Sequence, residues 1–362
     1  MIFNRLTGLD LGPESEDFII PGNIRPADAP TRYPFLWNAP VQDKTQWPGF
    51  ADNGSDILGL LRNVGEEFGV FGDFRPTTVP IINLYDFLSK NSANFDGLNK
   101  LEHLIRQIPP PAWPWPIDPV LAAQGKQVYQ QSGCGGCHWL DPIPPGIVRF
   151  PDVQTWATPH TRDVGTDTRE YDIMGWTADT GSLKNAWIPE VDPLKPTDSS
   201  FNILKMSVLG SIIGHEIFGA GGPGPQSTTP AASQVPLAVL PRLRELKGAF
   251  RPTEAPRGAY ESRVLQGIWA AAPYLHNGSV PTLVELLKPA AQRVSEFKVG
   301  PAYDTVNVGL AVEQPQSNYT LKTTDCSDRN SGNSRCGHEG NGFGTNLSDQ
   351  DKKALLEFLK TL

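Results

Sequence analysis

Two cysteines and a histidine lie close together in the chain with the types and spacing of a covalent haem site. Cys134 and Cys137 are separated by two glycines, and His138 follows directly. In a c-type attachment motif each thiol adds across one haem vinyl group, and the next residue brings an imidazole under the iron. The sequence therefore predicts one covalently bound haem c, held by Cys134 and Cys137, with His138 as the proximal metal ligand.

A zinc half-site and a redox-active dithiol are the alternatives for this motif. A zinc site needs a second ligand pair at metal-binding spacing, and the chain has no other CxxC or HxxxH pair. A thioredoxin-like dithiol needs a strand–helix–strand context, whereas the flank of Cys134 has a helical pattern with proline-rich borders. Haem is therefore the favoured interpretation.

The remaining two cysteines, Cys326 and Cys336, flank a loop rich in Gly, Ser and Asn. An even pair in a protein that should be exported favours a disulfide between them. This bond would close a short loop and stiffen the residues that follow, which include His338.

The composition limits the possible partners and the location. The net charge is −8 and no basic block occurs, so nucleic acid is not expected as a partner. The sequence contains no run of eighteen apolar residues, so it predicts no membrane span. Covalent haem attachment normally takes place outside the cytoplasm, so we expect a periplasmic or secreted protein. The first six residues lack the features of a signal peptide; either one has been removed or upstream sequence is missing, and we expect the second.

Hydrophobic spacing predicts a mainly α protein with long irregular connections, because Gly and Pro number 35 each. Asn53 or Ser55 is expected to cap the first helix, Asp118 and Thr282 to cap later ones, and the mid-helix Gly125 predicts a close helix crossing. The predicted helices cover 57–68, 81–89 and 97–107, a segment that begins at 119 and leads into Cys134, a short segment after Thr282, and 348–362.

A proline-rich stretch, residues 109–116, is incompatible with helix and predicts a stiff linker. It divides the chain into residues 1–115 and a haem domain, residues 116–362. The haem domain has a helix leading into the attachment motif and an amphipathic helix at its C-terminal end. This is the skeleton of a class I cytochrome c domain, here with a long insertion.

With these residues, the chain resembles the bacterial di-haem cytochrome c peroxidase superfamily, and within it the rubber-oxygenase-like branch. The resemblance rests on the haem motif and on three further segments, which are residues 62–66 (RNVGE), 272–283 (APYLHNGSVPTL) and 337–339 (GHE). Family members carry two CxxCH motifs, one in each cytochrome c-like domain. The single motif here corresponds by position to the second, electron-transfer haem. The resemblance implies that residues 1–115 are the later part of a first domain whose CxxCH is absent.

The resemblance also implies roles for individual residues around the haem. His338 is expected to be the distal metal ligand, with a surface histidine as the alternative. His276 is expected beside the haem and is a rival ligand, as are Met174 and Met206, whose contexts favour packing. From their position and chemistry, Trp139 is expected against the haem, with core packing as the alternative, and Arg263 and Arg257 are expected as propionate partners, with surface salt bridges as the alternative. Phe68 and Phe71 are candidates for the distal pocket of the first haem, and packing in the helix core is favoured for Phe68.

The expected function follows from the resemblance and the filled axial positions. This haem would pass single electrons within a peroxidase- or dioxygenase-like oxidoreductase, with a donor or acceptor protein or a second haem as its partner. A small-molecule oxidant is a further expected partner of the complete enzyme. The alternative is a complete mono-haem electron carrier without catalysis of its own. Calcium occurs in many di-haem peroxidases, but no motif here supports a calcium site.

Overall fold

The computed structural model describes residues 20–70, 72–79, 84–140, 162–188, 191–218, 240–250 and 256–362. These residues form two compact units, each discontinuous in sequence. The first is built from the described parts of 1–27, 50–107 and 173–252, and the second from those of 28–49, 108–172 and 253–362. The sequence predicted a single boundary at residue 115. The observed division differs from this prediction because 28–49 packs with the second unit and 173–252 packs with the first.

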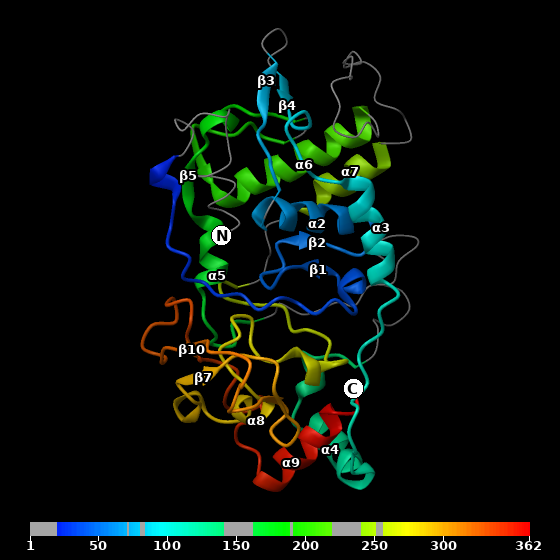
Figure 1. Cartoon of the computed structure of the whole chain (residues 1–362), viewed down its shortest axis with the longest axis vertical. Helices are drawn as coiled ribbons and strands as arrows, with labels where there is room; N and C mark the ends of the chain where they lie inside the picture. Colours follow the sequence, from blue (N-terminus) through cyan, green and yellow to red (C-terminus); the bar gives the residue numbers. More distant parts are fainter. Residues whose placement is uncertain are drawn as a thin grey trace. The chain divides into compact units, whose positions relative to one another are not determined.

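In its described part, the first unit contains four helices and two short antiparallel strand pairs (Figure 1). Helix α2 carries six buried apolar side chains, at Ile57, Leu58, Leu60, Leu61, Val64 and Phe68, and it contacts the other three helices. The helices are α2 (Asp56–Val70), α3 (Phe95–Ile105), α6 (Ser200–Phe218) and α7 (Leu240–Ala249); the strand pairs are β3 (Thr77–Val79) with β4 (Leu84–Asp86) and β5 (Thr177–Asp179) with β6 (Thr197–Ser199). Strand β2 (Ala51–Asp52) belongs to the first unit and β1 (Lys44–Thr45) to the second.

The predicted helices 57–68 and 97–107 are confirmed as α2 and α3, whereas the predicted helix 81–89 is wrong. Residues 84–86 form β4, which pairs antiparallel with β3 so that Thr77 lies opposite Asp86. Residues 81–83 lie outside the described part of the chain. A short apolar run has no decisive period of its own, and here pairing with a neighbouring strand determines its structure.

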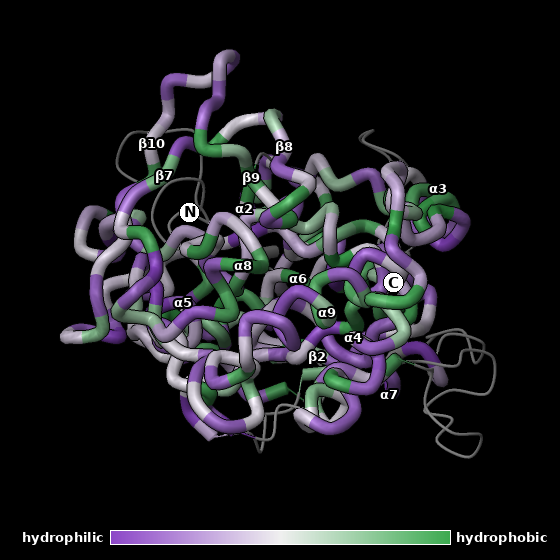
Figure 2. Tube along the Cα trace, turned by 90° about the horizontal axis from the view of Figure 1, so that it is seen from below, coloured by the Kyte–Doolittle hydropathy of each residue, from purple (hydrophilic) through white to green (hydrophobic). Residues whose placement is uncertain are grey.

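The second unit contains few regular elements besides two crossing helices. Figure 2 shows the hydropathy of each residue along the trace. The elements are α4 (Pro119–Gln131), α5 (Arg169–Asp172), α8 (Leu283–Leu286), α9 (Asp349–Leu359) and the antiparallel pairs β7 (Glu296–Lys298) with β10 (Thr320–Lys322) and β8 (Tyr303–Asp304) with β9 (Gly309–Leu310). Short 3-10 turns occur in both units, at Pro21–Asn23, Ala39–Val41, Cys134–Gly136, Ile173–Gly175, Gly181–Leu183, Ile268–Ala271 and Ala290–Gln292.

The helix starts in this unit follow the predicted caps. Asp118 accepts hydrogen bonds from the amides of Val120 and Leu121 at the start of α4. Ser348 caps α9 through the amide of Asp351, and Thr282 caps α8 through the amide of Glu285. In the first unit Ser55 rather than Asn53 accepts from the α2 backbone, from the amide of Leu58 at 3.3 Å. Each cap pairs an amide that would otherwise have no partner within its helix.

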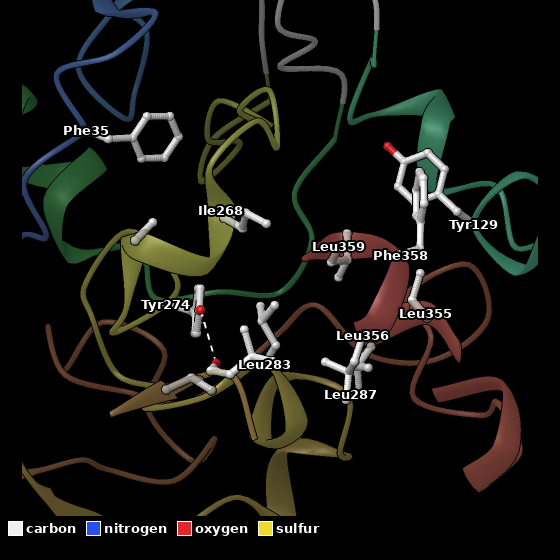
Figure 3. Close-up of a cluster of buried hydrophobic side chains, with 13 residues drawn as sticks. Phe35, Tyr129, Ile268, Tyr274, Leu283, Leu287, Leu355, Leu356, Phe358 and Leu359 are labelled. Carbon is white, nitrogen blue, oxygen red and sulfur yellow. Dashed lines mark hydrogen bonds between the residues drawn. The ribbon is translucent and has the colours of Figure 1, made fainter. Parts of the chain in front are cut away.

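Helices α4 and α9 cross at Gly125, which confirms the predicted close approach. A Cβ atom at residue 125 would lie 1.9 Å from the carbonyl oxygen of Ala354 and 2.8 Å from Cβ of Phe358. No side chain fits there, so glycine is required for the two backbones to meet. Beside the crossing, Phe358 packs edge-on against Tyr129, with ring centroids 5.4 Å apart (Figure 3). The apolar cluster at this crossing supports the helix that leads into the haem motif.

None of the described helices is long and apolar enough to cross a membrane.

Candidate haem site

The attachment motif follows α4 in a tight turn. Gly133 takes a left-handed conformation with φ of 76°, and the 3-10 turn η5 (Cys134–Gly136) comes directly after it. The amide of His138 donates to the carbonyl oxygen of Cys134 at 2.9 Å, which closes the loop between the two thiols. Both thiols are half-buried in the wall of one pocket, and burial raises the pKa of Cys134. The loop thus presents both thiols and the imidazole to the same cavity.

This pocket lies entirely within the second unit and is mainly apolar. Its apolar walls come from the segment before α4, from α8 and from α9, and include Phe35, Trp47, Leu283, Leu286, Leu287, Leu355 and Leu359. Polar and charged residues occupy part of the lining, namely Arg32, His138, Arg162, Tyr260, Glu261, Arg263, His276 and His338. An apolar cavity with a few polar groups is the usual environment of a bound cofactor.

His138 is held with one ring nitrogen turned toward the protein backbone. Its Nδ1 donates a hydrogen bond to the carbonyl oxygen of Arg263 at 2.7 Å, which leaves Nε2 as the nitrogen for a metal. The Tyr129 hydroxyl donates to the carbonyl oxygen of His138. Burial lowers the pKa of His138, so its imidazole is neutral, as a metal ligand requires.

His338 faces His138 across the pocket. The two ring centroids are 6.2 Å apart and the rings are inclined by 52°. An imidazole nitrogen lies about 1.1 Å from its ring centroid and binds a metal at about 2 Å, so two imidazoles on opposite sides of one metal ion have centroids roughly 6 Å apart. Burial and the nearby His138 lower the pKa of His338 to about 3. The residues present therefore fit a haem iron between two neutral imidazoles.

The rival ligands take other positions. His276 lines the pocket but stacks on Tyr260, with ring centroids 3.8 Å apart. Met206 is buried in α6 and Met174 lies in the turn Ile173–Gly175, and neither lines the pocket. Of the histidines elsewhere, His215 stacks on Phe95, His103 is exposed, and His160 lies outside the described residues.

Two arginines contact the same tryptophan in the pocket wall. The guanidinium carbons of Arg32 and Arg263 lie 4.7 and 4.8 Å from the ring centroid of Trp47. Arg263 forms a buried ion pair with Glu261 at 2.6 Å, and its Nε is buried without a hydrogen-bond partner. Burial, followed by repulsion from Arg263, lowers the pKa of Arg32 to about 9. Two arginines, one buried and one half-buried, thus lie in the pocket wall, and guanidinium groups suit the carboxylates of haem.

Two of the predicted haem contacts do not line the pocket. Arg257 is exposed and binds both carboxylate oxygens of Asp172. Trp139 is half-buried and is not among the lining residues. Phe68 packs in the core of the first unit, where it stacks on Phe74 at 4.4 Å, which confirms the core packing favoured for it. Phe71 lies outside the described residues.

Sequence reasoning missed Arg32, Trp47 and Arg162 as pocket residues. They come from segments before and after the haem motif, and no local pattern marks them. Arg162 lies over the ring of Phe343, 4.9 Å from its centroid, and Phe343 in turn packs edge-on against His338 at 5.0 Å. Among the described residues, no group of three or more His, Cys, Asp or Glu side chains could hold a metal ion such as calcium.

Comparison with known proteins finds a family match for one segment of the second unit. Residues 259–298 match the family described as RoxA-like, cytochrome c-like. This segment is similar to that of a rubber-oxygenase-like cytochrome c. The matched residues include Arg263 and His276 of the pocket wall, and a c-type cytochrome domain implies haem c as the cofactor.

Two proteins of Sinorhizobium fredii resemble the chain over nearly all of its length. One, named y4iJ, is 28% identical over 99% of this chain and 60% of its own length. The other, y4iM, is 27% identical over 93% of this chain and 66% of its own length. The chain therefore spans about two thirds of the length of these relatives, or somewhat less.

Proposed function

We propose that the second unit is an electron-transfer domain of the cytochrome c type. It would bind one haem c through Cys134 and Cys137, with His138 and His338 as the two axial ligands. The observation that carries the proposal is the 6.2 Å separation of the two imidazole centroids across the pocket. The match of residues 259–298 to a cytochrome c-like family supports the same cofactor.

The side chains of the pocket have distinct tasks in this proposal. Haem iron, when bound, supplies reversible transfer of one electron. With His138 and His338 both bound to the iron, no position on the metal would remain for a small-molecule substrate. Arg32 and Arg263 neutralise the propionates, and the apolar walls keep water away from the site. A rigid, dry site with fixed ligands changes little between oxidation states, which favours electron transfer over substrate binding.

The wider function extends beyond the described pocket. We propose that this domain exchanges electrons with a second haem or a protein partner in a di-haem, peroxidase- or dioxygenase-like oxidoreductase. The alternative is a mono-haem carrier that serves a separate enzyme. The match to a RoxA-like family favours the di-haem oxidoreductase, because this family is the rubber-oxygenase-like branch that the sequence resembles. We further propose a periplasmic or secreted location, which the disulfide between Cys326 and Cys336 supports.

The test is a set of spectra on the chain produced with covalent haem attachment. A pyridine haemochrome should give one haem for each polypeptide, and electron paramagnetic resonance should give one low-spin ferric signal with two imidazole ligands. Replacement His338→Ala should yield a high-spin haem that binds cyanide, and free imidazole should restore the low-spin signal. His276→Ala is the matched control and should remain low-spin. A wild-type haem that is high-spin, or one unaffected by His338→Ala, would refute the proposed ligation.

A further inference from the structure

The backbone of the distal ligand is held by a buried arginine that does not line the haem pocket. Arg293 is only 3% exposed. Its Nη1 donates to the carbonyl oxygen of Arg335 at 2.7 Å, and its Nη2 donates to that of His338 at 3.3 Å. One guanidinium therefore binds the backbone of this loop at two points, Arg335 and His338.

The other bonds of Arg293 tie this loop to the wall of the pocket. Its Nε donates to the carbonyl oxygen of Lys288 at 3.1 Å, and its Nη2 also donates to that of Leu286 at 3.2 Å. Leu286 ends α8, and its side chain lines the haem pocket. Arg293 thus links His338, which would bind iron, to Leu286 at the end of α8, which lines the pocket.

The backbone of His338 needs this support because its conformation is unfavourable. Its φ is 54°, in the left-handed region that few residues other than glycine adopt. Such a residue persists only where its surroundings determine its position, and conformations of this kind are concentrated at functional sites. Glycine would adopt this conformation at the lowest cost. The chain nevertheless has a histidine here, directly after Gly337.

Two further contacts hold the residues on either side of His338. Glu339 accepts a hydrogen bond from the amide of Ala290 at 2.7 Å, which is a second link to the segment after α8. Gly337 packs so closely on the backbone of Gly165 and Thr166 that a Cβ there would lie 2.3 Å from the amide nitrogen of Thr166. The amide of His338 itself donates to the carbonyl oxygen of Val164 at 2.9 Å.

We propose that Arg293 is a positioning residue that keeps His338 in place as the distal ligand of the haem. This inference rests on the proposed function, since it assumes that His338 binds iron. Arg293 does not line the cavity, and its guanidinium donates to four backbone carbonyl oxygens. Lysine cannot replace it, because a single ammonium group lacks the planar array of donors that reaches several carbonyls at once.

The experiment compares Arg293→Lys with wild type and with His338→Ala, all in the haem-loaded full chain. We expect Arg293→Lys to be a mixture of low- and high-spin haem, with cyanide affinity raised by about tenfold, the usual scale for loss of a residue that orients a metal ligand. Free imidazole should return the mixture to low-spin. Exchange of the His338 amide hydrogen should also become faster, a readout independent of the haem signal.

Arg257→Lys is the matched control, because Arg257 lies in the same unit but binds Asp172 at the surface. It should leave both the spin state and the cyanide affinity unchanged. If Arg293→Lys does not fold, Glu339→Ala loosens the same loop with Arg293 retained, and it should give a smaller high-spin fraction. A wholly low-spin spectrum of Arg293→Lys, or of Glu339→Ala if Arg293→Lys does not fold, would overturn the positioning role.

The two proposals fail in different ways. If wild type is low-spin and His338→Ala is not, while Arg293→Lys behaves as wild type, the ligand assignment holds and only the positioning role is lost. If His338→Ala leaves the wild-type spectrum unchanged, the ligand assignment fails and the role of Arg293 fails with it.

Discussion

The carbonyl oxygen of Arg263 accepts the Nδ1 hydrogen of His138 at 2.7 Å, and the side chain of Arg263 pairs with Glu261 in the wall of the same pocket. One residue therefore orients the proximal imidazole with its backbone and supplies a buried positive charge with its side chain. The two effects can be separated, because a substitution removes the charge and leaves the carbonyl in place.

The charge of Arg263 should raise the reduction potential of the haem. A cation near the iron disfavours the ferric state, which carries one more positive charge than the ferrous state. Arg263→Met should therefore lower the potential by roughly 60 mV, a tenfold change in a one-electron equilibrium. Potentiometric titration followed by visible absorption measures the change. Arg257→Met, at the surface, is the control, and equal potentials in all three proteins would contradict the prediction.

The helix crossing at Gly125 should be intolerant of even one methyl group. In Gly125→Ala the new Cβ would overlap the carbonyl oxygen of Ala354, which is backbone and cannot rotate away. We expect a loss of about 3 kcal/mol in the free energy of unfolding, at the upper end for overpacking, even though alanine favours helix. Guanidinium unfolding monitored by circular dichroism measures it. Gly175→Ala, where nothing lies within 4 Å of the added Cβ, should change stability little.

This crossing also shows which parts of the fold the sequence could predict. α2, α4 and α9 were predictable because each combines a cap with a long apolar period, and the mid-helix Gly125 signalled a close contact. The strand β4 was not predictable, because three residues carry no period and their structure depends on pairing with β3. The two-unit division was also missed, since segments 28–49 and 173–252 are assigned by long-range packing.

The candidate site was predictable to the extent that its chemistry is local. Cys134, Cys137 and His138 form a contiguous motif, and His338 was expected through the resemblance and the neighbouring disulfide. Arg32 and Trp47 lie in an irregular segment about a hundred residues before the motif, and they reach the pocket only through tertiary packing. Arg257 and Arg263 were both expected as propionate partners, and sequence alone does not show that Asp172 binds Arg257 at the surface.

The disulfide between Cys326 and Cys336, which the structure confirms, should stabilise the protein. Replacement of both residues by alanine should lower the free energy of unfolding by about 2–3 kcal/mol, the effect expected for a short closed loop. Guanidinium unfolding with and without a reducing agent provides the measurement. Reduction should destabilise wild type by a similar amount and leave the double variant unaffected. A variant as stable as wild type would show that other contacts hold the loop.

Buried His276 should make the protein sensitive to acid. Burial, followed by the charge of Arg32, lowers its pKa from 6.5 to about 3. The unfolded chain takes up a proton below pH 6.5 and the folded chain does not until about pH 3, so stability decreases as pH falls through this range. The loss is about 1.4 kcal/mol for each pH unit below 6.5.

His276→Phe keeps an aromatic ring against Tyr260 but cannot bind a proton. Relative to wild type, it should lose less stability between pH 7 and pH 4.5, a difference of about 3 kcal/mol from this one residue. Guanidinium unfolding at both pH values gives the comparison. His103→Gln, which changes an exposed histidine, is the control variant. The same pH dependence in His276→Phe and wild type would show that His276 does not cause the acid sensitivity.

The four cysteines of the chain place opposite demands on its maturation. Cys326 and Cys336 together must lose two electrons and two protons to an external oxidant to form their disulfide, whereas, under the proposed function, Cys134 and Cys137 must remain thiols until they react with haem. Cys134 and Cys137 are only three residues apart in sequence, so a disulfide between them would block haem attachment. Under the proposed function, one pair must therefore be oxidised and the other kept reduced in the same polypeptide, and the order of disulfide formation and haem attachment decides whether the chain gains its cofactor.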